Sequence, residues 1–104
     1  MNDPIIAADD CTTMAEVRAG VDELDRQLVD LLARRFGYMR AAARIKPTRD
    51  SVRDEDRKQQ VITAATMAAQ RSDMPAGFVA RIWDDVVETS IAYELDHWDA
   101  LRSA

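Results

Sequence analysis

The feature that most constrains this chain is an uninterrupted helical pattern over Met14–Ile45, with no proline before Pro47. Directly before its apolar residues, Thr13 and Glu16 have the Thr-x-x-Glu spacing of a capping box, which favours a helix start. The apolar residues recur at alternating steps of four and three, which places them on one helical face. They are Val17, Val21, Leu24, Leu28 and Leu31. The pattern predicts one helix from about Met14 to Ile45.

A helix of this length is too long for its own chain to cover. About 32 residues at a rise of 1.5 Å per residue span roughly 48 Å. The whole chain has only 104 residues, and a compact domain of that size has a radius of gyration of about 13 Å. The uncovered part of the apolar face must pack on another copy of the chain. The sequence therefore predicts a homodimer with two-fold symmetry.

Two further helices are expected after two breaks in the pattern. Proline and neighbouring polar residues mark these breaks, one around Pro47 and one around Pro75. The second helix is expected over about Asp54–Gln70, and the third from Pro75, placed in its first turn, to about Leu101. Because the chain has only 3 Gly and 3 Pro, a strand-rich fold with many tight turns is disfavoured. The sequence predicts an all-α chain of three helices.

The same periodicity predicts which faces of these helices point inward. The second helix begins at Ser51 or Asp54, either of which is a suitable N-cap. Its expected inward face carries Arg57, Val61, Ala64, Ala65 and Ala68. The third helix has a wide apolar face, made of Phe78, Val79, Ile82, Trp83, Val86, Val87, Ile91, Leu95 and Trp98. We expect residues 1–10 to form a mobile N-terminal arm and residues 11–104 to form one helical domain.

Composition excludes several classes of function. A net charge of −5 disfavours a nucleic-acid partner, and no apolar stretch approaches the roughly 20 residues that a membrane span needs. Cys11 is the only cysteine and His97 the only histidine, so a cysteine cluster and a His-rich metal site are excluded. We expect neither a metal nor a cofactor. The first residues lack the basic and apolar regions of a secretory signal, so the expected location is the cytoplasm.

Two cations interrupt the apolar face of the first helix. Continuing the steps of four and three from Leu31 leads to Arg35 and Lys46. These residues are separated by roughly 16 Å along the helix axis, enough to bracket a small ligand that carries two charges. Alternatively, both aliphatic stems lie along the apolar face while their charged groups reach solvent, and this alternative is stronger for Lys46, beside the helix end.

Two polar residues interrupt the apolar face of the third helix. Ser90 and Glu94 lie one turn apart, in line with apolar neighbours on both sides. A core ion pair between Glu94 and Arg35 or Lys46 is one explanation, and such structural pairs are common. The other explanation is a binding site. If Arg35, Lys46 and Arg57 meet this single carboxylate, positive charge is left over, and it is satisfied by an anionic ligand.

Several short motifs, in this order, resemble those of the all-helical chorismate mutases. They are Arg18, the pair Arg34-Arg35, Lys46, the run Val52-Arg53-Asp54-x-Asp56-Arg57, and Ser90 with Glu94. The N-terminal run also resembles the bacterial isochorismate-pyruvate lyases, which share that fold. It comprises Asp10-Cys11-Thr12, Val17-Arg18, Leu31, Arg34-Arg35 and Ala41-Ala42. The similarity spans about Asp10–Leu101.

The resemblance implies an intertwined homodimer with two equivalent sites for a small dianionic substrate, chorismate or isochorismate. By this resemblance Arg35, Arg57 and Arg18 of the other copy hold the two substrate carboxylates. Lys46 donates to the enol-ether oxygen and to a carboxylate, and Glu94 donates to the same ether oxygen. Ser90 helps to seat a carboxylate, and Asp54 approaches the ring hydroxyl. Lys58 departs from the family, because the typical mutase has an acidic residue there that contacts the ring hydroxyl.

The residues suit the rearrangement of chorismate to prephenate that the resemblance implies. This reaction needs fixed charge and neither a nucleophile nor a metal. Cations hold the flexible dianion in its reactive conformation, and donors stabilise the charge that develops on the ether oxygen. The expected activity is chorismate mutase, with Lys46, Glu94 and Arg35 as catalytic residues. Isochorismate-pyruvate lyase is the alternative enzyme, favoured by the N-terminal helix and Lys58. A non-catalytic helical dimer, or a subunit that acts only with a partner enzyme, is the alternative from another class.

Overall fold

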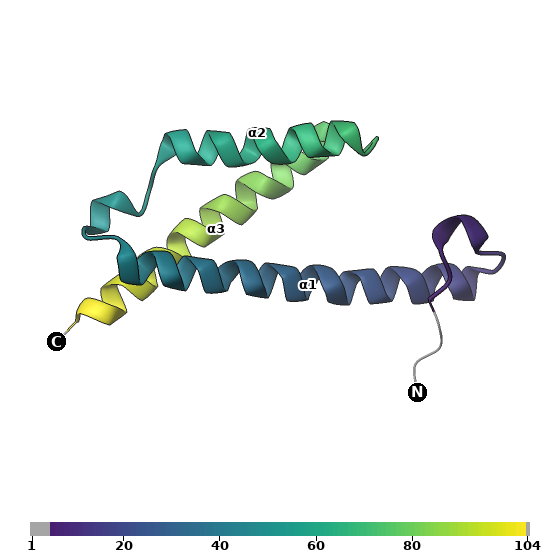
Figure 1. The fold of residues 1–104 in the computed structure, drawn as a ribbon, viewed down its shortest axis with the longest axis horizontal. Helices are drawn as coiled ribbons and strands as arrows, with labels where there is room; N and C mark the ends of the chain where they lie inside the picture. Colours follow the sequence, from purple (N-terminus) through teal and green to yellow (C-terminus); the bar gives the residue numbers. More distant parts are fainter. Residues whose placement is uncertain (1–4, 104) are drawn as a thin grey trace. The chain divides into compact units, whose positions relative to one another are not determined.

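A computed structural model describes residues 5–103, and every regular element in this range is helical (Figure 1). Three α-helices and two short 3₁₀-helices follow one another in the order η1 (Ala8–Asp10), α1 (Met14–Ile45), η2 (Arg49–Ser51), α2 (Glu55–Arg71) and α3 (Ala76–Arg102). The prediction of an all-α chain with three helices is confirmed. The chain divides into two compact units, one ending at Arg35 and the other beginning at Phe36.

The first helix has the predicted bounds because its start is capped as the sequence indicates. The Glu16 carboxylate oxygen Oε1 accepts hydrogen bonds from the backbone N–H groups of Thr12 at 2.9 Å and Thr13 at 3.0 Å. The Thr13 hydroxyl in turn accepts from the backbone N–H of Glu16 at 3.2 Å. These bonds satisfy N–H groups that have no partner inside the helix. The hydrogen bonds, led by that from Thr12, also lower the pKa of Glu16.

The N-terminal segment has more structure than expected in its described part. Ala8–Asp10 form a short 3₁₀-helix that no periodicity predicted. A cavity of about 290 Å³ is lined by residues 5–8 and Cys11 together with the first turns of α1, including Val17, Val21 and Leu24. The described part of the expected mobile arm is therefore folded against α1. Residues 1–4, which also belong to the expected arm, lie outside the described residues.

The apolar stripe of α1 stays open within the first unit. Its members, Val17, Val21, Leu24, Leu28 and Leu31, are between 38% and 58% exposed. Single exposed apolar residues are ordinary on protein surfaces. Five in one row form a continuous apolar face whose exposure to water is unfavourable. The stripe was predicted to need a second chain, and within its own unit the N-terminal segment covers it only in part, near Val17, Val21 and Leu24.

The core of the second unit forms where α2 packs on α3 (Figure 1). Val52, Val87 and Ile91 are buried at its centre, and four partly buried residues surround them: Val61, Ile62, Leu95 and Trp98. The part of α1 in this unit contacts α3 through Phe36, whose ring lies 4.7 Å from that of Tyr93 in an edge-to-face arrangement. The His97 ring also lies against Tyr93, with ring centroids 4.5 Å apart. The single histidine is thus part of an aromatic cluster.

The turn between α2 and α3 stops the second helix as the sequence predicts. Asp73 has a φ of 57°, in the left-handed region that aspartate tolerates better than most residues. Its N–H donates to the carbonyl of Gln70 at 3.3 Å, and the N–H of Met74 donates to the carbonyl of Ala69 at 2.8 Å. This pair of bonds is a Schellman motif, which satisfies the last carbonyls of a helix. Pro75 then takes the N-cap position of α3, one residue before the predicted first turn.

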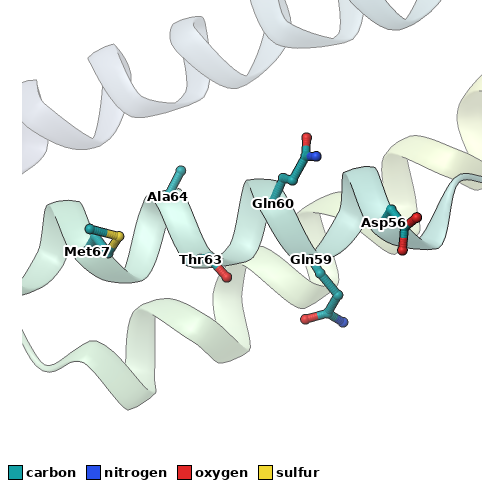
Figure 2. Close-up of a pocket in the computed structure, with 6 residues that line it drawn as sticks. All are labelled: Asp56, Gln59, Gln60, Thr63, Ala64 and Met67. Carbon is teal, nitrogen blue, oxygen red and sulfur yellow. The ribbon is translucent and has the colours of Figure 1, made fainter.

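The inward face of α2 is rotated from the predicted one. Arg57, Ala64 and Ala68 are exposed, whereas the buried or half-buried side holds Lys58, Val61, Ile62, Ala65 and Ala69. The rotation follows from Ile62, because burying both Val61 and this larger side chain against α3 moves the centre of the face toward it. Phe78, expected on the apolar face of α3, is also exposed. Figure 2 shows residues that line an open pocket along α2, Ala64 and Met67 among them.

Candidate functional site

A buried ion pair joins the end of α1 to α3. The Lys46 amine Nζ lies 2.7 Å from carboxylate oxygen Oε2 of Glu94, and it donates a hydrogen bond to the carbonyl of Val52 at 3.2 Å. Glu94 is only 4% exposed, whereas the side chain of Lys46 keeps 30% of its surface. Among the described residues, no partner is aligned to hydrogen-bond Oε2. The contact between the two residues is therefore an ion pair, and the carboxylate that it engages lies in a buried place.

Ser90 adds a second buried polar group, one turn before Glu94 on α3. Its hydroxyl donates to the carbonyl of Val86 at 2.6 Å. Within the described part of the chain, Ser90 and Glu94 are the polar residues that are buried. The sequence predicted both on the apolar face of this helix, and the structure places both inside. Burying a carboxylate beside one amine is costly unless function or a further partner compensates.

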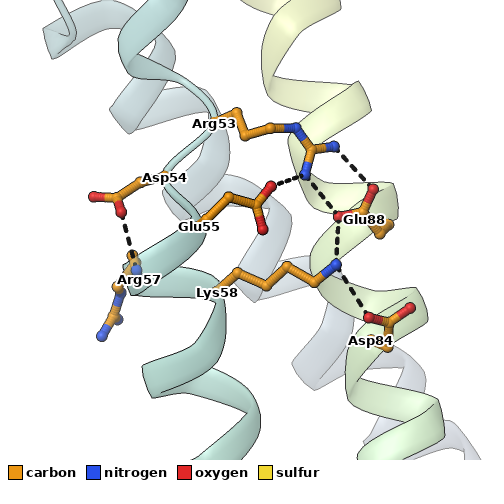
Figure 3. A network of polar contacts seen from close by, with 7 residues as sticks. All are labelled: Arg53, Asp54, Glu55, Arg57, Lys58, Asp84 and Glu88. Carbon is orange, nitrogen blue, oxygen red and sulfur yellow. Dashed lines mark hydrogen bonds and ion pairs between the residues drawn. The ribbon is translucent and has the colours of Figure 1, made fainter.

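The loop before α2 and its first turn position Asp54 and Arg57. Asp54 is the N-cap of α2, and its Oδ1 accepts a hydrogen bond from the backbone N–H of Arg57 at 3.0 Å (Figure 3). Asp54 rather than Ser51 is therefore the cap, while the Ser51 hydroxyl donates to the carbonyl of Thr48. The expectation that Arg57 turns inward is wrong, since the residue is exposed. Its reach toward a ligand stays a prediction.

Lys58, instead of Arg57, faces α3 and belongs to a network of charges. This α2–α3 ion network consists of Arg53, Glu55, Lys58, Asp84 and Glu88 (Figure 3). Glu88 accepts from Arg53 at 2.8 and 3.0 Å and from Lys58 at 2.9 Å, and Lys58 also lies 3.1 Å from Asp84. The side chain of Lys58 is 14% exposed. The network draws this amine toward α3.

The network shifts the titration of its members. Hydrogen bonds from Arg53 and then Lys58 lower the pKa of Glu88 to about 2. Hydrogen bonding to Glu88, followed by that to Asp84, raises the pKa of Lys58. Sequence reasoning missed this network. The available signal was the pair Asp84 and Glu88, one turn apart on the third helix and opposite in charge to Arg53 and Lys58.

Sequence reasoning also missed what holds the end of α1. The indole N–H of Trp98 donates to the carbonyl of Lys46 at 3.0 Å, and so does Arg102, again at 3.0 Å. Trp98 was expected as part of the apolar face, and Arg102 was assigned no role. No sequence pattern pairs these residues with Lys46, because they lie more than 50 positions away along the chain.

Arg18 and Arg35 belong to the first unit. Arg18 is exposed near the start of α1, and Arg35 is half-buried at the end of that unit. Residues 5–103 contain no group of three or more His, Cys, Asp or Glu side chains placed to hold a metal ion. Over the same residues, no helix is both long and apolar enough to cross a membrane.

Comparison with known proteins adds to this geometry. The sequence profile described as chorismate mutase type II matches residues 17–95. This chain belongs to the chorismate mutase type II family. The resemblance inferred from the motifs is thereby confirmed at the level of the family. The chain is also 27% identical, over 96 residues, to the isochorismate pyruvate lyase of Pseudomonas aeruginosa. That alignment covers 92% of this chain and 95% of the lyase.

The part that matches the chorismate mutase family contains all the predicted site residues. It begins at residue 17, just before Arg18, and ends at residue 95, just after Glu94. Trp98 and Arg102 lie beyond it. What the structure brings together within the second unit is Lys46 with Glu94, and Asp54 with Arg57 at the start of α2.

Proposed function

We propose that this chain is a chorismate mutase, which rearranges chorismate to prephenate. The observation that carries the proposal is the buried carboxylate of Glu94 beside the half-exposed amine of Lys46. Fixed charge in a place poor in water is what a concerted rearrangement of a dianion requires. In this reaction the ether C–O bond breaks while a C–C bond forms, and no group is transferred to the protein. Membership of the chorismate mutase type II family supports the same assignment.

In this mechanism Lys46 and Glu94 act on the oxygen of the breaking bond. The Lys46 amine donates to that oxygen and to a substrate carboxylate. Glu94 donates to it too, which a carboxyl group does only when it carries a proton. Since Glu94 pairs with Lys46 in the free protein, binding of the dianion has to redistribute charge between them. Removing one such preorganised donor typically lowers the rate by about 10²–10³.

The remaining site residues hold the substrate. We assign the two carboxylates to Arg35, Arg57 and the Arg18 of a second copy, with Ser90 assisting, and the ring hydroxyl to Asp54. These roles follow the family resemblance. Cations placed around both carboxylates keep the ring and the enolpyruvyl side chain in the folded, reactive conformation.

The exposed stripe of α1 supports a homodimer. Its five apolar residues, from Val17 to Leu31, gain cover when a second copy packs on them. The same contact gives Arg18, which lies beside Val17, a place next to another chain. We therefore propose that each site is completed by the Arg18 of the other copy. In this proposal, formation of the dimer also completes the site, because a single chain lacks the second Arg18.

Isochorismate-pyruvate lyase is the second candidate. The similarity to the Pseudomonas aeruginosa lyase covers most of both chains. Lys58 favours this activity as well, because it stands at the position where the typical mutase has an acidic residue. Its amine forms ion pairs with Asp84 and Glu88. The lyase cleaves the same kind of C–O bond in isochorismate, with transfer of a hydrogen to the departing enolpyruvyl group. Its products are salicylate and pyruvate.

Turnover of the two substrates decides between these candidates. Purified protein is incubated separately with chorismate and isochorismate, and prephenate, salicylate and pyruvate are measured. The mutase proposal predicts prephenate from chorismate, with a rate reduced at least about 100-fold in Lys46→Met. Ser103→Ala, an exposed change outside the site, serves as the control and keeps the full rate. Salicylate with an equal amount of pyruvate from isochorismate alone selects the lyase. Conversion of neither substrate selects the non-catalytic dimer.

A further inference from the structure

The last turn of α3 closes the end of α1. The final carbonyls of an α-helix have no partners within the helix itself. Arg102 donates to two of them, that of Ala43 at 3.0 Å and that of Arg44 at 3.5 Å. It also donates to the carbonyl of Lys46, the first residue after the helix, at 3.0 Å. A guanidinium is suited to this place, because its fan of donors reaches several acceptors and its charge opposes the negative end of the helix dipole.

Trp98 holds Arg102 and shares its target. The guanidinium carbon lies 4.1 Å from the centroid of the Trp98 ring, a cation–π arrangement. A further hydrogen bond, at 3.3 Å, joins Arg102 to the Trp98 carbonyl. The Trp98 indole N–H donates to the Lys46 carbonyl at 3.0 Å. The Lys46 carbonyl oxygen therefore accepts two hydrogen bonds from the same turn of α3.

The other end of Lys46 lies in the candidate site. Its N–H still donates to Ala42 within α1, at 2.9 Å, so the backbone of Lys46 is fixed on both sides. A lysine side chain has four flexible carbons, and where its amine can reach depends on where its backbone is held. With the backbone held, Nζ lies between Glu94 and the carbonyl of Val52.

We propose that Arg102 is a positioning residue, which acts with Trp98 to hold Lys46 so that its amine meets the reacting ether oxygen. This inference rests on the proposed function, because it assigns to Lys46 the role given there. Arg102 itself touches neither substrate nor reacting atoms. It lies after residue 95, where the match to the chorismate mutase family ends.

Two variants test the proposal. Arg102→Gln removes the charge and most of the donors, and Trp98→Phe removes the indole N–H while keeping an aromatic ring for Arg102. We expect each to lower kcat about 10- to 100-fold, because displacing a catalytic group by about 1 Å has an effect of this order. KM should change less than about twofold, since Arg35, Arg57 and the Arg18 of the second copy still hold the substrate carboxylates that Lys46 also contacts. Arg102→Lys, which keeps the charge with fewer donors, should fall between Arg102→Gln and the unchanged protein.

Arg71→Gln is the matched control. Arg71 is also an exposed arginine in the last turn of a helix, and its replacement should leave kcat unchanged. Circular dichroism and thermal melting confirm that each variant is folded under assay conditions. Equal kcat in Arg102→Gln and the unchanged protein contradicts the proposal. So does a loss of activity that is fully accounted for by an unfolded fraction.

Nuclear magnetic resonance tests the same point without turnover. The Trp98 indole N–H signal, identified by its absence in Trp98→Phe, should exchange faster with solvent in Arg102→Gln. The Lys46 side-chain methylene next to the amine should shift or broaden in the same variant and stay unchanged in Arg71→Gln. An unaltered Lys46 signal overturns the inference. If the unchanged protein converts neither substrate, the proposed function fails, while these signals still decide whether Arg102 positions Lys46.

Discussion

The two units of this chain use similar apolar patterns with opposite results. In the second unit, Val52, Val87 and Ile91 are buried between elements of the same chain. In the first unit, the stripe that includes Leu24 and Leu28 is more than half exposed at both residues. Periodicity therefore reveals which face of a helix is apolar, but the length of the helix decides whether its own chain can cover that face. In this chain the second unit carries the buried ion pair, and the first carries the surface that we assign to a second copy.

Breaking the stripe should have the largest effect. Leu28→Asp places a charge in the middle of the apolar face, where pairing with a second copy would bury it at high cost. We expect loss of the dimer and activity reduced to background. Ala64→Asp puts the same charge on an exposed position of α2 and should change neither property. Sedimentation velocity at micromolar concentration measures the dimer. A dimeric, active Leu28→Asp protein would contradict the role given to the first unit.

Changing Glu94 should have the next largest effect and sharpens the role of the second unit. Glu94→Ala removes the donor and should lower kcat/KM about 10²–10³-fold at every pH. Glu94→Gln supplies a permanent amide donor of nearly the same size. Since the natural carboxyl donates only with a proton, we expect activity of the unchanged protein to decline as the pH rises above the acidic range. The Gln variant should not show this decline and should be the more active at neutral pH.

The pH profiles from pH 5 to 8 provide the measurement for Glu94. A flat profile for the unchanged protein would exclude a proton-dependent donor at this position. A Gln variant as impaired as the Ala variant would do the same. Either result would leave Glu94 as a structural partner of Lys46, which is how the ion pair alone would be explained.

The smallest effect is expected from the α2–α3 ion network and concerns stability. The pKa of Glu88 is about 2, below its ordinary value of 4.5. A group whose pKa is lowered in the folded state stabilises that state at any pH above the group's ordinary pKa. This contribution is lost as the pH falls toward the pKa of the folded state. The loss should therefore occur between about pH 4.5 and pH 2. Glu88→Gln should reduce this loss of stability at low pH.

Urea unfolding at pH 7, 4 and 2.5 tests the role of Glu88. The free energy of unfolding of the unchanged protein should fall more steeply with decreasing pH than that of Glu88→Gln. Asp85→Asn, a change at a neighbouring exposed residue outside this network, is the control. The effect should be modest because exposed charge pairs are screened by water and salt. Parallel slopes for all three proteins would show that Glu88 does not contribute.

Much of the fold was accessible from sequence because it depends on local signals. The capping box at Thr13 and the proline at position 47 fix the ends of the long helix, which begins and ends where predicted. The face of α2 was predicted less well. Its small alanines allow two rotations, and only packing against α3 shows that Lys58 rather than Arg57 turns toward that helix.

The candidate site divides in the same way. Ser90, Glu94 and Lys46 interrupt apolar patterns, so the sequence alone singled them out, and the structure pairs two of them. The contacts of Arg102 with the end of α1 could not be predicted, because they depend on where two distant helix ends meet. Sequence patterns identify polar residues in unusual places, whereas the residues that position them become visible only in three dimensions.

Complementation between two inactive chains tests most directly whether each site is built from two copies of the chain. Arg18→Ala and Arg35→Ala proteins are unfolded together, mixed in equal amounts and refolded, and chorismate and isochorismate turnover is measured. If each site takes Arg35 from one chain and Arg18 from the other, every mixed dimer contains one intact site and one doubly altered site. Random pairing then restores about a quarter of the activity of the unchanged protein. Activity no higher than that of the two separate variants, in a mixture shown to contain mixed dimers, would contradict the shared site.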